Sequence, residues 1–203
     1  MRYFPVNLDL QGREVVVIGA GEVGLRKIET LLEAGAKVKV YDPKPLPELQ
    51  KMKVRLVRRA YRLGDLGQAF AAIAATDDRK VNRAIHAEAK RKKILLNIVD
   101  KPEFCGFVFP ARVSRGEFLV TVSTGGGSPA LSKKVREDLE KIFGPEYGEL
   151  VKLLGKIRKR FDPASLKGMQ KAFTDFVRSP ILSLLKKRDQ KGIDRLVQQY
   201  FKT

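Results

Sequence analysis

The chain has 203 residues, 43% hydrophobic and 32% charged, a composition typical of a folded globular protein and unlike that of a disordered one. Its 41 Lys and Arg against 23 Asp and Glu give a formal charge of +18, which favours polyanionic ligands. The one cysteine, Cys105, excludes an internal disulfide framework. Because the sequence also lacks a signal-peptide pattern and any apolar run of about 20 residues, we expect a cytoplasmic protein without a membrane segment.

Up to about residue 100, strand and helix patterns alternate. The apolar run Val15–Ile18 is typical of a strand buried on both faces, as in a parallel sheet. We expect strands at Glu14–Ile18, Lys37–Tyr41, Lys53–Val57, Ala71–Ala75 and Leu95–Val99. Helices are expected at Val23–Ala34 and at Arg79–Lys92, the latter capped by Asp77 or Asp78. This order predicts an α/β fold built on a Rossmann-type, doubly wound parallel sheet.

After Asp100 the pattern becomes that of a mixed α+β segment. Strands are expected at Phe107–Phe109 and Glu117–Ser123, without a long helix between them. A helix then begins in the stretch STGGGSP, with Ser128 as its N-cap and Pro129 in its first turn. Its apolar face consists of Leu131, Val135, Leu139 and Ile142. We expect this face to contact a partner subunit.

The remainder of the chain is helical. Pro145, Pro163 and Pro180 each mark an expected helix start. A small apolar core is expected from Phe173, Phe176, Val177, Ile181, Leu184 and Leu185. The sequence therefore predicts an α/β domain at 1–110, a mixed segment at 111–144, and a helical C-terminal domain at 145–203.

A glycine-rich turn follows the first strand. Gly19, Gly21 and Gly24 form GxGxxG between a buried strand and a helix, the context in which this motif binds a dinucleotide pyrophosphate. Asp42 closes the second strand and can accept hydrogen bonds from the ribose hydroxyls. Its charge would repel a 2′-phosphate, so NAD is favoured over NADP, although Lys44 and Arg26 soften this argument.

Three further polar stretches follow later strands, at the edge where open α/β sheets bind ligands. They are AATDD (74–78), which contains Thr76 as a further candidate cofactor contact, NIVD (97–100) and STGGGSP (123–129). With these stretches in view, the chain resembles the precorrin-2 dehydrogenase and sirohydrochlorin ferrochelatase family of sirohaem synthesis. The resemblance covers about residues 1 to 145 and rests on FPVNLDLQGREVVVIGAGEVGLRKIETLLEAGAKV, ATDDRKVN, NIVDKPEFCGFVFPA and VSTGGGSPALSKKVRE, in that order.

The resemblance implies NAD-dependent oxidation of precorrin-2 to sirohydrochlorin, followed in some members by insertion of ferrous ion, and a homodimer. It makes 1–110 the NAD-binding domain and 111–144 the dimerisation and substrate segment. It makes Asp100 the essential carboxylate. It assigns the nucleotide loop to Gly19, Gly21, Glu22, Val23 and Gly24. The adenosine-side contacts then fall on Asp42, Pro43 and Lys44, although many relatives lack an acid at the first of these positions.

The chemistry of such a substrate agrees with the residues. Precorrin-2 carries eight carboxylates, which a basic chain would attract, and Asp100 could act as the base while nicotinamide takes a hydride. The alternative for Asp100 is a strand-end residue that caps a turn before Pro102. No protein-borne metal site is expected, because one histidine and one cysteine cannot form a His/Cys cage.

The STGGGSP stretch has two interpretations. It could be no more than a capped helix start, or its N–H groups and hydroxyls could bind substrate carboxylates. In the second case the substrate-binding residues are Ser123, Thr124, Gly125, Gly126 and Ser128.

Two other functions compete with an enzyme. Dinucleotide folds also serve as NAD-sensing regulatory modules, but a sensor needs no second anion-binding constellation. Nucleic-acid binding is suggested by charge alone, and because no recognised DNA or RNA motif accompanies it, we expect no nucleic-acid partner.

Overall fold

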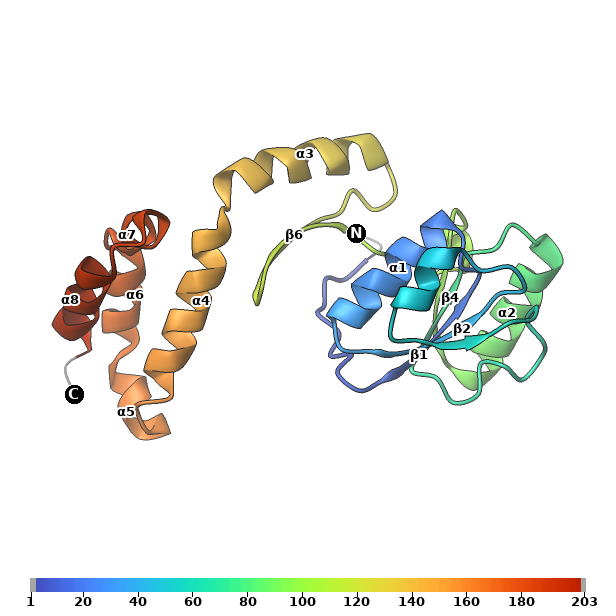
Figure 1. Cartoon of the computed structure of the whole chain (residues 1–203), viewed down its shortest axis with the longest axis horizontal. Helices are drawn as coiled ribbons and strands as arrows, with labels where there is room; N and C mark the ends of the chain where they lie inside the picture. The colour runs from blue at the N-terminus through green and yellow to red at the C-terminus, as the bar shows by residue number, and fades with distance from the viewer. Residues whose placement is uncertain (1–2, 202–203) are drawn as a thin grey trace. The chain divides into compact units, whose positions relative to one another are not determined.

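The structure is a computed structural model, and it describes residues 3–201. The chain divides after Phe109 into two compact units, each with its own core (Figure 1). The first unit contains the parallel sheet, and the second contains a β-hairpin and the C-terminal helices.

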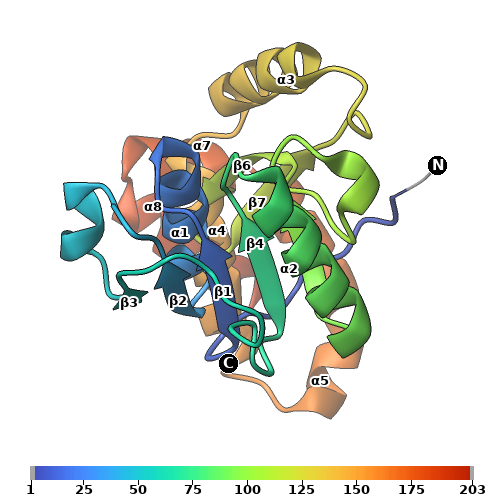
Figure 2. The ribbon, with the colours of Figure 1, turned by 90° about the vertical axis from the view of Figure 1, so that its right-hand side faces the viewer.

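The sheet of the first unit consists of parallel strands in the order β3-β2-β1-β4-β5, confirming the Rossmann-type fold (Figure 2). Val17 of the central strand pairs with Val40 on one side and Ile73 on the other. The order reverses at β1, so the crevice that binds ligands in such sheets lies at the carboxyl end of this strand. The strands are β1 (Glu14–Ile18), β2 (Lys37–Tyr41), β3 (Arg55–Val57), β4 (Ala71–Ala74) and β5 (Leu95–Ile98).

Helices α1 (Glu22–Glu33) and α2 (Arg79–Lys92) cover opposite faces of this sheet. Val15 and Val17 pack on the α1 side with Ile28, whereas Val16 and Ile18 pack on the α2 side with Ile85. The alternation explains the unbroken apolar run of β1, in which Val15, Val16 and Val17 are fully buried. Short 3-10 helices, η1 (Pro47–Lys51) and η2 (Pro102–Phe104), lie in the connections.

The α2 cap is Asp78, not Asp77. The Asp78 carboxylate accepts hydrogen bonds from the backbone N–H groups of Lys80 (2.8 Å) and Val81 (3.1 Å). These groups have no partner within the first turn of a helix, so the cap stabilises its start.

The prediction of a strand at Phe107–Phe109 is wrong. This segment contains no strand, and its apolar character has another cause: the Phe107 and Phe109 side chains pack against the α1-side core, with ring centroids 5.5 Å apart. A strand that was not expected follows it, β6 (Ala111–Arg115).

In the second unit, β6 pairs antiparallel with β7 (Phe118–Val122), within the range expected for the latter. Helices α3 (Pro129–Ile142) and α4 (Pro145–Arg158) pack on this hairpin. The rings of Phe118, Phe143 and Tyr147 join these elements, with centroids 5.0–5.3 Å apart.

The remaining helices are α5 (Pro163–Gly168), α6 (Gln170–Arg178), α7 (Ile181–Lys187) and α8 (Gln190–Tyr200). Helices α4, α5 and α7 begin at or directly after the three prolines, as expected. The core includes Phe176, Ile181 and Leu185, with Phe173 and Leu184 at its edge. The prediction that Val177 belongs to this core is wrong, because the residue is 42% exposed.

Candidate active site

The glycine loop joins β1 to α1 at the switch point of the sheet. Gly19 has φ +95, and a Cβ there would lie 2.2 Å from the carbonyl oxygen of Ala75. A Cβ on Gly24 would lie 2.2 Å from the carbonyl oxygen of Gly19. Both positions therefore require glycine for packing, whereas a Cβ on Gly21 would meet nothing within 4 Å. The space beside Gly21 is where a pyrophosphate would approach the backbone.

Helix α1 offers N–H groups at this space. Gly21 is its N-cap, with no side-chain capping bond, and Glu22 and Val23 form its first turn. The N–H groups of a first helical turn have no partner within the helix and attract anions. The loop and the helix start thus fit a dinucleotide pyrophosphate.

Asp42 has a role that the sequence did not indicate. Its carboxylate accepts hydrogen bonds from the N–H of Ala20 (Oδ2, 2.6 Å) and from the N–H of Lys44 (Oδ1, 2.6 Å). The side chain therefore ties the glycine loop and the turn after β2 to one point. Each carboxylate oxygen has capacity for a further hydrogen bond, so ribose hydroxyls can still donate to it.

Thr76 follows β4 at the same edge of the sheet. Its hydroxyl accepts a bond from the Asp78 N–H (3.3 Å), and its carbonyl accepts one from Asn82 Nδ2 (2.9 Å). These contacts fix the turn between β4 and α2 beside Gly19, which faces Ala75. Pro43 and Lys44 are exposed after β2.

Asp100 follows β5 and is exposed. Its φ of +58 lies in the left-handed region, which costs free energy for residues other than glycine, though least for Asn and Asp. It lines a cavity of about 350 Å³ together with Val23 of the nucleotide loop. The first unit thus brings the candidate base and the start of α1 to one cavity.

Basic side chains line this cavity too, and the sequence indicated only one of them, Arg26, as a charge near Asp42. They are Arg26, Lys27 and Lys101. Asp100 is the only acidic residue among the described residues that line the cavity. A helical periodicity could have found Lys27, because it lies four residues after Val23 on α1 and so shares its face.

Lys27 is the most constrained of these cations. Its Nζ lies 4.0 Å from the centroid of the Phe109 ring, within cation–π range. Burial lowers the pKa of the Lys27 ammonium, the charge of Arg26 lowers it further, and the charge of Asp100 acts in the opposite sense. Burial and the neighbouring Arg26 thus disfavour the charged form of Lys27. An anionic ligand in the cavity would stabilise that charge.

Asn97 and Cys105 also line the cavity and hold the loop that follows β5. Asn97 Nδ2 donates to the carbonyl of Phe107 (2.9 Å), and the Cys105 sulfur lies 3.2 Å from both the N and the O of Ile98. These bonds hold the loop 101–109 against the end of β5. Within residues 3–201, no cluster of three His, Cys, Asp or Glu side chains could hold a metal ion.

The STGGGSP stretch belongs to the second unit. The Ser128 hydroxyl caps α3 by accepting the Leu131 N–H (3.2 Å), as expected. The Thr124 hydroxyl interacts with both the N–H and the carbonyl of Ser128 (3.1 Å each), and the Ser123 hydroxyl accepts the Gly125 N–H (3.2 Å). Gly125 and Gly126 have positive φ, +63 and +90, with no neighbour near a Cβ. Their contact with substrate stays a prediction.

The comparisons with known proteins agree with this geometry. Residues 6–111, more than half of the chain, match a family model described as putative NAD(P)-binding. The chain belongs to this family. Its cofactor class is therefore a nicotinamide dinucleotide.

No helix within residues 3–201 has the length and apolar character that crossing a membrane requires.

Two curated relatives of this NAD(P)-binding chain are siroheme synthases. That of Ectopseudomonas mendocina (strain ymp) is 41% identical over 162 residues, which cover 79% of this chain and 35% of the relative. That of Nitrosospira multiformis is 41% identical over 168 residues, covering 79% and 36%. The chain thus matches about a third of each relative's length.

A solved structure matches over nearly the whole chain. SirC, described as a precorrin-2 dehydrogenase, superposes with a TM-score of 0.76 at 28% sequence identity, covering 99% of this chain and 100% of that one. The resemblance to the sirohaem-synthesis family, stated from the motifs, is therefore confirmed by sequence relatives and by fold.

Proposed function

We propose that the chain oxidises precorrin-2 to sirohydrochlorin, with NAD as the hydride acceptor. The observation that carries the proposal is the cavity at the end of β5, where Asp100 lies among Arg26, Lys27 and Lys101 beside the start of α1. A substrate with eight carboxylates suits three cations around one base. The match to SirC supports the same reaction.

The dinucleotide is bound by the glycine loop and by the edge of the sheet around it. Gly21, Glu22 and Val23 offer N–H groups to the pyrophosphate, and the open space at Gly21 admits it. Asp42 accepts the ribose hydroxyls and, being negative, disfavours a 2′-phosphate, which makes NAD the preferred cofactor. When bound, the nicotinamide ring supplies the hydride acceptor.

The substrate is held by the basic side chains and deprotonated by Asp100. Arg26, Lys27 and Lys101 bind carboxylates of the macrocycle by charge-assisted hydrogen bonds. This orients the ring toward Asp100, whose carboxylate accepts the proton that the oxidation releases. Phe109 and Val108 give the cavity an apolar wall against the ring.

Insertion of ferrous ion into sirohydrochlorin is a second proposed step. It requires removal of two pyrrole protons, which Asp100 could accept one after the other in the same cavity, passing the first to solvent before it takes the second. Iron would enter as a substrate. An alternative function, that of an NAD-sensing module without catalysis, predicts no turnover at all.

Three features complete the proposal. The residues Ser123, Thr124, Gly125, Gly126 and Ser128 are proposed to bind further substrate carboxylates. The chain is proposed to be a homodimer joined through α3, because Leu131 and Ile142 on this amphipathic helix are 53% and 59% exposed. A cytoplasmic location is proposed from the single cysteine.

The deciding experiment is an anaerobic assay of the purified chain with precorrin-2 and NAD, followed by ferrous ion. We expect the absorbance of sirohydrochlorin and NADH to rise together, and NADP to react more slowly. If NAD binds but neither product forms, the sensing module replaces the enzyme. A further spectral change when ferrous ion is added after the oxidation would identify the chelatase step.

A further inference from the structure

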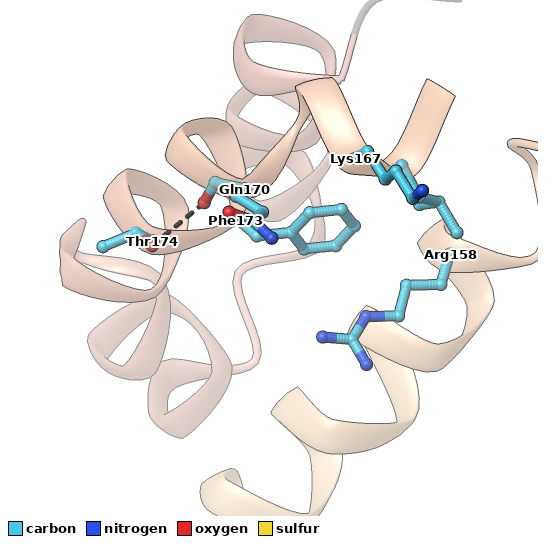
Figure 3. A pocket seen from close by; sticks show the side chains of 6 residues that line it. Arg158, Lys167, Gln170, Phe173 and Thr174 are labelled. Atoms are coloured by element: carbon cyan, nitrogen blue, oxygen red, sulfur yellow. Dashed lines mark hydrogen bonds between the residues drawn. The ribbon is translucent and has the colours of Figure 1, made fainter. Parts of the chain in front are cut away.

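The second unit contains a pocket that the proposed reaction does not use. It has a volume of about 550 Å³, within the roughly 300–1,000 Å³ typical of small-molecule sites. Figure 3 shows its lining side chains, which come from α4, α5 and α6. They are Arg158, Leu166, Lys167, Gln170, Phe173 and Thr174.

One of the residues that line the pocket is aromatic and packs against the core of the second unit. The ring of Phe173 lies 4.7 Å from that of Phe201, between centroids, and Phe201 is buried beside Phe176. The guanidinium carbon of Arg158 lies 5.4 Å from the Phe173 centroid. The guanidinium lies over the Phe173 ring, so a flat ligand can stack on this ring when its own carboxylates draw the Arg158 side chain aside.

The polar groups at the pocket favour anions. Arg158 and Lys167 form no ion pair within residues 3–201, and no acidic side chain is among the described lining residues. By contrast, Lys171 on the same helix as Phe173 is paired with Asp175 at 2.6 Å. The Thr174 hydroxyl donates its proton to the carbonyl of Gln170 (2.9 Å), so the cations Arg158 and Lys167 are the groups that favour an anion here.

We infer that this pocket binds a flat conjugated ring bearing carboxylates, stacked on Phe173 with its carboxylates on Arg158 and Lys167. Arginine and lysine bind carboxylates by charge-assisted hydrogen bonds, and arginine also lies over aromatic faces. The choice of a tetrapyrrole as the ring rests on the proposed function. The pocket is then a second docking site for the tetrapyrrole, separate in its residues from the Asp100 cavity.

The test is a titration of the full chain with uroporphyrin, a porphyrin with eight carboxylates. Binding is monitored by fluorescence quenching at about 0.15 M salt. The pocket variant carries Arg158→Met and Lys167→Met. The control carries Lys156→Met and Lys159→Met, which remove the same charge from residues outside the lining. We expect the pocket variant to lose one bound porphyrin per chain or about tenfold in affinity, and the control less than about twofold.

Two outcomes would overturn the inference. Equal losses in the pocket variant and the control would reduce the effect to overall charge. If the pocket variant loses ATP binding as strongly as it loses uroporphyrin binding, the recognised group is a phosphate and not a carboxylate.

The kinetics of precorrin-2 oxidation separate this inference from the proposed function. We expect kcat and KM to be unchanged in the pocket variant, since its residues lie outside the Asp100 cavity. If wild-type chain binds the porphyrin at the pocket but oxidises no precorrin-2, the proposed function fails and the docking site stands. If the chain oxidises precorrin-2 normally but its porphyrin binding is the same in the pocket variant, the docking site fails and the proposed function stands.

Discussion

The carboxylate of Asp42 and the backbone N–H of Ala20 form a hydrogen bond of 2.6 Å, which joins the end of β2 to the glycine loop. The residue proposed to select the cofactor thus also shapes the loop that is proposed to hold the pyrophosphate. Hydrogen bonds to charged groups contribute about 1.5–3 kcal/mol, so this contact matters for the geometry of the loop.

Replacing Asp42 by Asn should therefore weaken NAD binding by about tenfold or more, because the ribose loses a charged acceptor and the loop loses part of its anchor. NADP should lose less, because removing the charge also removes repulsion of the 2′-phosphate. Isothermal titration with each cofactor measures both effects. An equal loss for NAD and NADP would leave Asp42 as a loop anchor without a role in selectivity.

A pair of glycine substitutions separates ligand approach from packing. Gly21→Ala adds a Cβ into open space, so stability should change by less than about 0.5 kcal/mol while dinucleotide affinity falls at least about tenfold. Gly24→Ala places a Cβ 2.2 Å from the Gly19 carbonyl oxygen and should destabilise the fold by about 1–3 kcal/mol. Urea unfolding and NAD titration of both variants give the comparison. Normal NAD affinity in Gly21→Ala would argue against the proposed pyrophosphate position.

Asp100→Asn should lower the kcat of precorrin-2 oxidation by about 10²–10⁴, the usual contribution of a positioned base. Asparagine tolerates the left-handed conformation at this position, so the variant should fold normally. NAD affinity, measured separately, should stay within about twofold. A wild-type rate would reduce Asp100 to a residue that shapes the turn before Pro102.

Lys27→Met tests substrate binding by the cavity cations. The loss of one charge-assisted hydrogen bond should raise the KM for precorrin-2 by about tenfold. The matched control is Lys37→Met, at an exposed position in β2 that does not line the cavity, and its KM should not change. If both substitutions raise KM equally, overall charge and not the cavity attracts the substrate.

The same Lys27→Met variant makes a prediction about pH and stability. Burial lowers the folded-state pKa of Lys27 below its ordinary 10.5, so the unfolded chain binds this proton more tightly than the folded chain does. Its contribution therefore disfavours folding at neutral pH, and this penalty disappears as pH rises through the lowered pKa towards 10.5. Urea midpoints should show Lys27→Met more stable than wild type near pH 7, with the gap closing near pH 10. A gap that does not depend on pH would indicate a packing effect.

The proposed dimer is tested by Leu131→Lys combined with Ile142→Lys on α3. Both side chains are more than half exposed, so the substitutions should spare the subunit's fold while placing charges in the interface. Sedimentation velocity should show a shift from dimer to monomer. Val177→Lys on α6, another exposed apolar position in the second unit, serves as control and should leave the dimer intact.

The sequence by itself determined the parallel sheet and the dinucleotide loop. Both depend on short-range patterns: the apolar run Val15–Ile18 identifies a strand buried on two faces, and the glycine spacing identifies the turn after it. The Ser128 cap was predictable for the same reason, and so was a cap of α2 at Asp77 or Asp78, since a cap acts on N–H groups two or three residues away. The structure decided that the α2 cap is Asp78.

Only the tertiary structure decided which side chains meet across the sheet. Apolar composition predicted a strand at Phe107–Phe109 and a core position for Val177, but composition does not say whether a backbone finds a ladder partner or which way a side chain faces. The second role of Asp42 and the gathering of Arg26, Lys27 and Lys101 around Asp100 depend on β1, β2 and β5 ending at one edge. Contacts between residues more than about 20 positions apart leave no local pattern, so they become visible only once the chain is folded.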